Sequence, residues 1–580
     1  MSTISKQKRT LIEDSKEIVR FSGVSLAFLR QFYEDVKAGN LASEVRLVEA
    51  SEQLAEDVWV GRTIRVDAPG KAYVPYRKSQ VLQDFEESEV KDRPRSEWTI
   101  ADMCDFVILP RCLKTRCFYQ DFLDSSQIGE PFQGAFVSQA RQSRFEDLVE
   151  ALENQFDGED ESKIYLWLDI FCANQPLLTD SESEEIMKTR YDLLSNNFHA
   201  AIKFFDMLVI YFNSWTEPLP LGRAWCIWEL YGAARVEKTL QVAMQTDQKQ
   251  VFLDALTEDS RSATMAITGI KPKNATCFDK DDLKMIQDSV ENDVGWTKLK
   301  AIVVEQLINW MIDTAEQACK NAEERVDKSD KNGMLEFAKL LYQTGVLSKE
   351  NNRLDEALKV TQKSLKIFES IDSTLSASNE ASALNNLGLI YMDTGNTEKA
   401  LEMFKRSNGI RVMVLGADNP TVADTLNNMA ILYKNKLKDL DKALRLYERA
   451  RKIYVVNYGE KHDQVALVLN NMGTLYGESG DWDKSIELLE KVFEIYKDKY
   501  GENDHPAVAL LMNNMGFSYE NKGLILKICE MDGYKPYLAK ALDLYERSYN
   551  MSIAMYGGNS DHPDIARTII NLERARTYEL

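Results

Sequence analysis

The chain has 580 residues, of which 44% are hydrophobic and 28% charged, proportions that are ordinary for folded globular protein. At roughly 150 residues per domain, this length predicts about four domains. Asp and Glu outnumber Lys and Arg by 92 to 71, for a net charge of −21, which argues against partners that are nucleic acids or anionic membrane surfaces. The apolar runs are too short to span a bilayer, and no signal peptide precedes them, so we expect a cytoplasmic protein without a membrane span.

Histidine is the scarcest chemically useful residue, with four in the whole chain. Three of them, His462, His505 and His562, occupy matching places in a repeat array, which leaves only His199 for chemistry elsewhere. A Ser-His-Asp triad and a multi-histidine metal site are therefore not expected, and we predict no metal site. The eight cysteines include no C-x-x-C pair, a pattern typical of free thiols in a reducing compartment.

Residues 1–95 are expected to be a mainly helical N-terminal region, because 15–39 carries apolar residues at helical spacing but no sustained heptads. From 96 to 258 the pattern changes, and short apolar runs alternate with amphipathic stretches. The runs are 134–138, 163–169, 207–212 and 239–244. This alternation predicts an α/β domain with a parallel sheet covered on both faces. Ligands bind beyond the carboxyl ends of such strands, where this chain carries Ser138, Asp169 and Asn213.

Two motifs in this region carry a resemblance to known families. Trp167-Leu-Asp169-Ile-Phe-Cys172-Ala-Asn174-Gln175 resembles the signature of fungal HET domains, which are relatives of TIR domains. Ala224-Trp225-Cys226-Ile-Trp-Glu229-Leu230 resembles the W-C-x-x-E-L helix of plant TIR domains. The resemblance covers about 98–258 and implies a flavodoxin-like, TIR/HET-like parallel-sheet domain. A similar module is joined to helical repeats in proteins of algae and other microbial eukaryotes.

The TIR resemblance implies a candidate catalytic residue, Glu229, because some TIR domains cleave NAD with a glutamate at the matching position. A carboxylate suits that reaction, since it stabilises the oxocarbenium-like transition state. Trp225, one helical turn earlier, could stack on a ring of the substrate. The alternative for Glu229 is a surface or structural helix residue. NAD is thus a possible substrate, and no cofactor is otherwise indicated.

Three further residues at strand ends are candidates for binding NAD. Ser138 could contact a ribose or phosphate, Arg141 a phosphate, and Asp169 a ribose hydroxyl. Each has a structural alternative, namely bracing a loop or capping the turn that follows. Asn174 and Gln175 could hydrogen-bond a ligand or brace their own loop.

Residues 259–330 are predicted to be a helical connector, and 331–580 a repeat array. The motif L-N-N-L-G recurs every 42 or 43 residues, beginning at Leu384, Leu426, Leu469 and Met512. Small residues at Gly388 and Ala400 would let two antiparallel helices approach closely, and Leu384, Leu387 and Tyr391 form the buried stripe. Such units bury their faces by stacking, so the sequence predicts an all-α solenoid.

The repeat motif and its turns, such as YGEKHDQVA at 458–466, resemble kinesin-light-chain-type tetratricopeptide repeats. That resemblance implies that the first asparagine of each pair faces a groove and binds the backbone of an extended peptide. These asparagines are Asn385, Asn427, Asn470 and Asn513. The alternative is that the asparagine pairs tie helices to adjacent turns.

Three functions remain open from the sequence. The first is an adaptor or signalling scaffold that binds a protein or peptide through its repeats and self-associates through a TIR-like domain. The second is an NAD glycohydrolase that uses Glu229 and is regulated by the repeats. The third is a kinesin-linked cargo adaptor, which the missing heptads argue against. A TIR–NTPase–repeat receptor is not indicated, since the chain has no G-x-x-x-x-G-K-[ST] motif.

Overall fold

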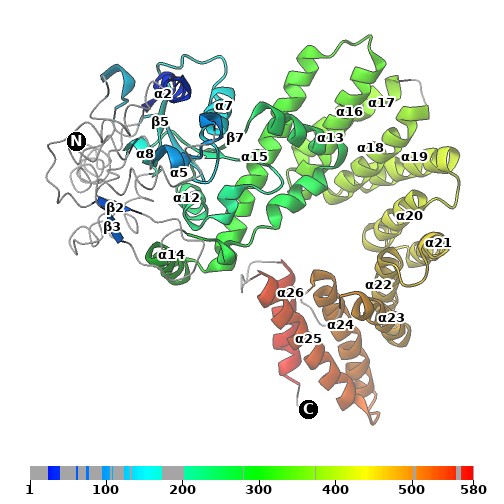
Figure 1. The fold of residues 1–580 in the computed structure, drawn as a ribbon. Coiled ribbons are helices and arrows are strands. Elements are labelled where there is room, and N and C mark those ends of the chain that lie inside the picture. Colours follow the sequence, from blue (N-terminus) through cyan, green and yellow to red (C-terminus); the bar gives the residue numbers. More distant parts are fainter. Residues whose placement is uncertain are drawn as a thin grey trace, which may run out of the picture. The chain divides into compact units, whose positions relative to one another are not determined.

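The computed structural model describes most of the chain in two compact units (Figure 1). The described residues are 24–38, 60–62, 74–76, 94–104, 108, 123, 125–130, 133–172, 202–277, 280–371, 374–500, 505–556 and 563–578. Unit 1 comprises 1–255 and 262–311, and unit 2 comprises 256–261 and 312–580. The candidates Asn174 and Gln175, and also His199, lie outside the described residues.

Unit 1 is built on a small mixed sheet, which confirms the predicted parallel pairing and adds one antiparallel edge. Its strands are β1 (Val24–Ser25), β4 (Ala135–Ser138), β5 (Tyr165–Trp167), β6 (Met207–Tyr211) and β7 (Leu240–Ala243). They lie in the order β1-β5-β4-β6-β7. β4, β5, β6 and β7 pair in parallel, and β1 pairs with β5 antiparallel. A separate hairpin joins β2 (Val60–Arg62) to β3 (Val74–Tyr76).

Helices complete unit 1, and in two of them residues 256–261 and 312–325 are assigned to unit 2. The longer ones are α2 (Leu26–Ala38), α7 (Phe145–Gln155), α12 (Ala224–Arg235), α13 (Thr246–Thr268), α14 (Lys280–Asp293) and α15 (Trp296–Arg325). The short ones are η3 (Arg95–Glu97), α5 (Ile100–Met103), η6 (Ser125–Gln127), α8 (Asp169–Cys172), η8 (Leu219–Gly222) and η9 (Pro272–Asn274).

The core of unit 1 is rich in aromatic rings because large side chains fill the space between sheet and helices. Phe136 of β4 stacks on Trp167 of β5 with ring centroids 4.6 Å apart. Phe32 of α2 meets Phe171 of α8 edge-on at 5.1 Å, which anchors α2 and β1 to the rest of the unit. Trp167 is therefore a core residue and not a platform for a ligand.

Unit 2 is a stack of helices that pack in chain order, as the repeat motif predicts. They are α16 (Lys331–Glu350), α17 (Leu354–Ser370), α18 (Thr374–Asp393), α19 (Thr397–Leu415), α20 (Pro420–Leu432), α21 (Leu440–Tyr458), α22 (Asp463–Glu478), α23 (Trp482–Tyr500), α24 (Pro506–Ile528), α25 (Tyr534–Tyr556) and α26 (Pro563–Arg576). Even-numbered helices are the first helix of each repeat, and α18, α20, α22 and α24 carry the asparagine pair. Among the described residues, no helix is both long and apolar enough to cross a bilayer.

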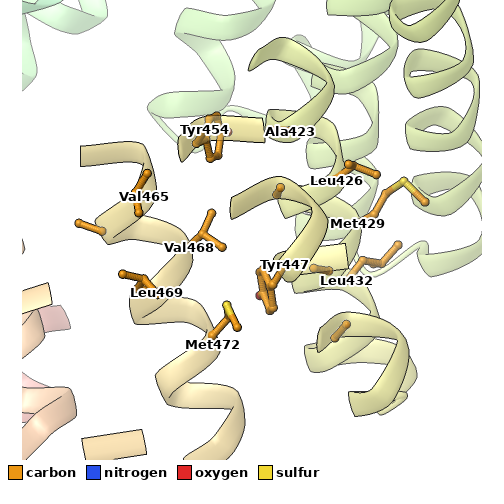
Figure 2. Packing of buried hydrophobic residues seen from close by; sticks show 14 of the residues in the cluster. Ala423, Leu426, Met429, Leu432, Tyr447, Tyr454, Val465, Val468, Leu469 and Met472 are labelled. Carbon is orange, nitrogen blue, oxygen red and sulfur yellow. The ribbon is translucent and has the colours of Figure 1, made fainter. Parts of the chain in front are cut away.

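The main core cluster of unit 2 runs through successive repeats from α16 to α25, and Figure 2 shows part of it, while smaller clusters lie at its two ends. Leu426 and Met429 of α20 lie in the same cluster as Tyr447 of α21 and Val468 of α22. All four are buried, so each first helix is covered by its own partner helix and by the next repeat. This continuous burial is the physical reason why such units are stable only as an array.

The glycine of the motif makes room for a large side chain of the partner helix. A Cβ atom on Gly388 would come within 2.5 Å of the Phe404 ring, and one on Gly516 within 2.7 Å of Tyr545. In the same way, Gly473 leaves room for Leu489. The small residue that was predicted to let backbones approach thus accommodates a buried ring or leucine of the second helix.

One repeat contains an extra residue, and the structure absorbs it in a π-helix. The segment from Asn427 to Ala443 is one residue longer than the matching segments of the neighbouring repeats. The turns of the π-helix η10 (Tyr433–Leu437) take up this residue at the end of α20. The next residue, Lys438, has φ 57°, where the neighbouring repeats place Gly395 and Gly480 at φ 81° and 86°.

Replacing Lys438 with glycine is expected to stabilise unit 2 by about 1 kcal/mol, because a residue with a Cβ is disfavoured in the left-handed region. Denaturant unfolding of the purified protein measures this gain. Gly480→Ala is the matched reverse change, since a Cβ there meets nothing within 4 Å and would add only backbone strain. An unchanged or lower stability of Lys438→Gly would contradict the assignment of strain to this turn.

Candidate functional site

The strand ends of unit 1 bring together most of the residues that the sequence singled out. Ser138 is the last residue of β4, and its hydroxyl donates a hydrogen bond to Oε2 of Glu229 at 2.5 Å. Glu229 lies in the middle of α12, which follows β6 in the chain. In the sheet, β4 lies between β5 on one side and β6 on the other, so the strand order reverses at β4. Open α/β sheets bind ligands in the crevice at such a reversal point.

A second polar pair lies beside the first. Nη2 of Arg141 is 2.5 Å from Oδ2 of Asp169, and Nε2 of Gln139 donates to Oδ1 of the same carboxylate at 2.9 Å. Asp169 begins α8 directly after β5. Arg141 and Asp169 thus neutralise each other, so a phosphate approaching Arg141 would have to share that guanidinium with Asp169.

The carboxyl group of Glu229 is electrostatically unusual. Helix α12 is apolar over most of its surface, and burial raises the pKa of Glu229 to about 8. The Ser138 hydrogen bond opposes this rise in pKa, whereas the negative charge of Asp169 adds to it. Carboxyl groups with a strongly raised pKa cluster at functional sites, which gives Glu229 a physical signature in addition to its motif.

The remaining predicted residues of this region have structural contacts. Trp225 lies one turn before Glu229, and its indole N–H donates to Asp282 of α14 at 3.4 Å. Oδ1 of Asn213, which follows β6, accepts a hydrogen bond from the backbone N–H of Leu219 and so braces the loop before α12.

Two residues near Glu229 were not singled out from the sequence. Gln139 follows Ser138 and bonds Asp169, and Cys226 places its sulfur 3.5 Å from the Gln139 carbonyl oxygen. Burial raises the pKa of the Cys226 thiol, so it is a neutral packing group. The sequence signal that could have identified Gln139 is its place next to Ser138, and the signal for Cys226 is its place within the W-C-x-x-E-L motif. Across the described residues, no group of three or more His, Cys, Asp or Glu side chains is arranged to hold a metal ion.

The asparagine pairs of unit 2 form a ladder between successive repeats. From the second pair onward, the second asparagine donates its side-chain N–H to the side-chain oxygen of the first asparagine in the preceding repeat, whereas Asn386 of the first pair donates to the hydroxyl of Thr361 at 3.3 Å. The rungs are Asn428 to Asn385 (3.1 Å), Asn471 to Asn427 (3.0 Å), Asn514 to Asn470 (3.2 Å) and Asn571 to Asn513 (3.0 Å). The pairs therefore tie first helices to one another rather than to adjacent turns.

The ladder leaves half of its hydrogen-bonding groups open. Within the described part of the chain, the side-chain nitrogens of Asn385, Asn427, Asn470 and Asn513 have no acceptor. The side-chain oxygens of Asn428, Asn471 and Asn514 likewise have no donor. Asn427 and Asn513 are buried, whereas Asn385 and Asn470 are half-buried, as are the second asparagines 428, 471 and 514. Both members of a pair can thus contribute to one surface.

Exposed apolar side chains flank the ladder in the later repeats. Leu467 of α22, Leu510 of α24 and Phe517 of α24 are exposed, and each lies three or four residues from an asparagine pair on the same helix face. In α26 the place of the first asparagine is taken by Ile570, which is 63% exposed. We call these four residues and the asparagines of the rungs the ladder face.

A comparison with known families identifies the class of the repeats. A family model of the tetratricopeptide repeat matches residues 379–454, 421–498 and 464–523. Residues 379–523 therefore contain tetratricopeptide repeats. A 100-residue segment is 28% identical to the photosystem I assembly protein Ycf3 of Prochlorococcus marinus. That match covers 17% of this chain and about half, 49%, of the relative's length.

Several solved structures are similar to part of this chain. BtubC of P. vanneervenii is 19% identical with a TM-score of 0.36, covering 44% of this chain and 94% of the other. The kinesin light chain TPR-like repeats of Podosopora anserina are 16% identical with a TM-score of 0.31, covering 38% and 95%. The quorum sensor NprR of B. thuringiensis is 13% identical with a TM-score of 0.34, covering 56% and 91%.

Proposed function

We propose that this protein is an adaptor whose tetratricopeptide repeats bind an extended peptide segment of a partner along the ladder face. The observation that carries the proposal is the ladder itself. It offers open amide donors and acceptors on neighbouring first helices, and the backbone of an extended peptide presents complementary N–H and C=O groups. Leu467, Leu510 and Phe517 beside the ladder would contact side chains of the bound peptide.

Charge on this surface supports a peptide bound mainly by its backbone. Lys434, at the end of α20, is bonded to Thr474 at 3.0 Å and lies 3.1 Å from Glu478, both on α22. Lys522 of α24 is paired with Asp483 at 2.6 Å. These charges are already neutralised, so amides and apolar contacts are the groups that remain for recognition.

Replacing Asn470 or Asn471 with alanine is expected to weaken peptide binding about five- to tenfold, the effect of losing one or two hydrogen bonds of about 1 kcal/mol. The measurement is fluorescence anisotropy with decapeptides selected from a random library on the full chain. Asn550→Ala, an exposed asparagine on α25, is the matched control. Equal affinity of all three variants, with thermal unfolding unchanged, would contradict the proposal.

Unit 1 leads to a further proposal, which concerns assembly. The four parallel strands lie in the order second, first, third, fourth, as in the flavodoxin-like arrangement, which supports the TIR/HET-like assignment of 96–258. We propose that this domain associates with a second copy of itself or with a partner, so that peptide binding by the repeats brings these domains together.

A second candidate function is hydrolysis of NAD in unit 1, favoured by the contact of Ser138 with a Glu229 carboxyl group whose pKa is raised to about 8. Glu229 must be ionised to stabilise a cationic transition state. We therefore expect nicotinamide release to increase between pH 7 and pH 9 as Glu229 loses its proton.

Nicotinamide release from NAD by the full chain tests this candidate. Glu229→Gln should reduce the rate at least a hundredfold, because a neutral amide cannot replace the charge. Glu217→Gln, an exposed glutamate before α12, should leave the rate unchanged. Equal rates in the wild type and in Glu229→Gln would remove the hydrolase from consideration and leave the adaptor.

A further inference from the structure

The hairpin of α24 and α25 carries an insertion that the preceding repeat lacks. The chain advances 28 positions from Asn513 of α24 to Ala541 of α25, against 15 from Asn470 to Ser485 in the repeat before. The added residues lengthen both helices, so α24 continues past the repeat before the chain turns back into α25. We call residues 524–537 the hairpin tip.

The hairpin tip extends beyond the first helices of the two neighbouring repeats. α22 ends at Glu478, which corresponds to Asn521 of α24, and α26 ends at Arg576, which corresponds to Tyr519. From this level α24 continues for about two more turns, to its end at Ile528. In the described part of the array, these turns have no first helix beside them.

The two helices of the hairpin pack closely at the base of the tip. A Cβ atom on Gly523 of α24 would lie 2.8 Å from Leu538 of α25, whose side chain is buried. The ring of Tyr537 lies 6.0 Å from that of Tyr519, across the same contact. The hairpin is therefore held by its inward side chains, and those that point outward are not needed to maintain it.

The outward side chains of the tip are apolar. Ile525, Ile528 and Met531 are 44%, 79% and 54% exposed. Ile525 and Ile528 are three residues apart and share one face of α24, and Met531 follows in the loop to α25. Neighbouring exposed apolar side chains of this kind mark surfaces that bind another molecule.

The charges around these apolar side chains balance one another. Lys527, Glu530, Asp532 and Lys535 are exposed, and within the described residues none of the four forms an ion pair. The Lys527 ammonium lies 5.7 Å from the centre of the Tyr534 ring. The tip thus has no net charge, whereas the whole chain carries −21. That net charge makes two copies of the chain repel each other, and the tip adds nothing to the repulsion.

We propose that the hairpin tip binds the hairpin tip of a second copy of this chain, about a two-fold axis. Such an interface uses the same surface twice and must be complementary to itself. Lys527 and Glu530 flank Ile528 in the sequence, so an antiparallel arrangement sets the lysine of each copy against the glutamate of the other. An anionic lipid surface would instead oppose Glu530 and Asp532 with like charge.

The contact is small, because stable interfaces bury about 800 Å² per partner and the tip offers three exposed apolar side chains. We therefore expect a dimer whose population depends on protein concentration. The interface lies in unit 2 and is distinct from the association proposed for unit 1, so substitutions in the tip separate the two. It does not depend on peptide binding by the ladder face.

Sedimentation velocity of the full chain over a range of concentrations measures this association. Ile528→Asp should raise the dissociation constant at least tenfold, because each copy then brings a carboxylate into the apolar contact. Ile528 is largely exposed, so the substitution leaves the fold intact. Met413→Asp is the matched control, since Met413 of α19 is 77% exposed but lies outside the tip, and it should leave the dissociation constant unchanged.

A charge exchange tests the two-fold arrangement. Lys527→Glu should weaken the dimer, and adding Glu530→Lys to the same chain should restore it, because the exchanged charges again attract across the axis. Cys529 is an exposed free thiol beside Ile528. A short bismaleimide should therefore link two wild-type copies but not two copies of Cys529→Ser.

Four results would overturn the proposal. The first is a wild type that stays monomeric at every concentration, and the second is a double exchange that fails to restore the dimer. The third is equal dimerisation of Ile528→Asp and the wild type, which would favour association through unit 1. The fourth is a monomeric wild type that binds phosphatidylserine vesicles while Ile528→Asp does not, which would assign the tip to a lipid surface.

Discussion

Replacing Arg574 with alanine is expected to lower the local stability of the last repeat by about 3 kcal/mol, because it leaves a buried carboxylate without its cation. Glu520 of α24 is 1% exposed and forms two hydrogen bonds of 2.7 and 2.6 Å with Arg574 of α26. The hydroxyls of Tyr545 and Tyr578 also donate to this carboxylate. These two remaining donors, and the 43% exposure of the Arg574 side chain, keep the expected loss at the low end for a buried pair.

Hydrogen exchange of α24 and α26 measures the loss of stability residue by residue. Arg576→Ala is the matched control, because Arg576 forms an exposed pair with Glu546 at 3.4 Å that is worth about 0–1 kcal/mol. The Arg574 contribution also depends on pH. Hydrogen bonds from Arg574 and the two tyrosines hold the pKa of Glu520 below its usual value despite burial, so this stability is present at neutral pH and is lost as the pH falls through the folded pKa. Equal protection in both variants would contradict the role of the pair.

Replacing Glu229 with glutamine is expected to stabilise unit 1 at pH 9 but not at pH 4. The pKa of Glu229 rises from 4.5 to about 8 on folding, so between these values the folded protein holds a proton that the unfolded chain has released. Raising the pH through this window therefore favours unfolding. A shift of one pKa unit corresponds to about 1.4 kcal/mol of stability, and solvent screening reduces this value because the Glu229 side chain is only half-buried. Ionised Glu229 therefore lowers the free energy of unfolding at pH 9 by an amount on the order of 3 kcal/mol.

Denaturant unfolding followed by tryptophan fluorescence measures this effect, because most of the described tryptophans lie in unit 1. The difference in free energy of unfolding between Glu229→Gln and wild type should increase from pH 5 to pH 9. Glu217→Gln should show no such trend, since Glu217 is exposed. A flat difference would show that the Glu229 carboxyl is not buried as a neutral acid, and it would also remove the physical signature that favours catalysis.

The repeated Leu-Asn-Asn motif and the alternating apolar runs predicted the main architecture, because both patterns record which residues are buried. The repeats agree with a tetratricopeptide family model, and the parallel strands were placed at the right segments. The β1 strand was not predicted, since a two-residue strand such as Val24–Ser25 leaves no periodic signal. The π-helix at Tyr433–Leu437 was missed in the same way: a single extra residue changes a spacing but not a composition.

The candidate sites were predicted less completely, because side-chain pairing depends on register between segments far apart in the chain. Motifs identified Ser138 and Glu229 separately, but their hydrogen bond follows from the packing of α12 over the end of β4. Arg141 and Asp169 were each assigned to a ligand, and only the fold shows that they bind each other. The asparagine ladder depends equally on register, since the partners in a rung are 43, 44 or 58 residues apart.

Every rung of the asparagine ladder points the same way, with a later repeat donating to an earlier one. The hydrogen bonds of the rungs therefore share one direction along the array, from the later repeat to the earlier one. A surface with this polarity distinguishes the two directions of a bound chain, because reversing the peptide exchanges the order of its N–H and C=O groups. If the repeats bind a peptide as we propose, this shared direction would favour one orientation of the bound chain over the other before any of its side chains are recognised.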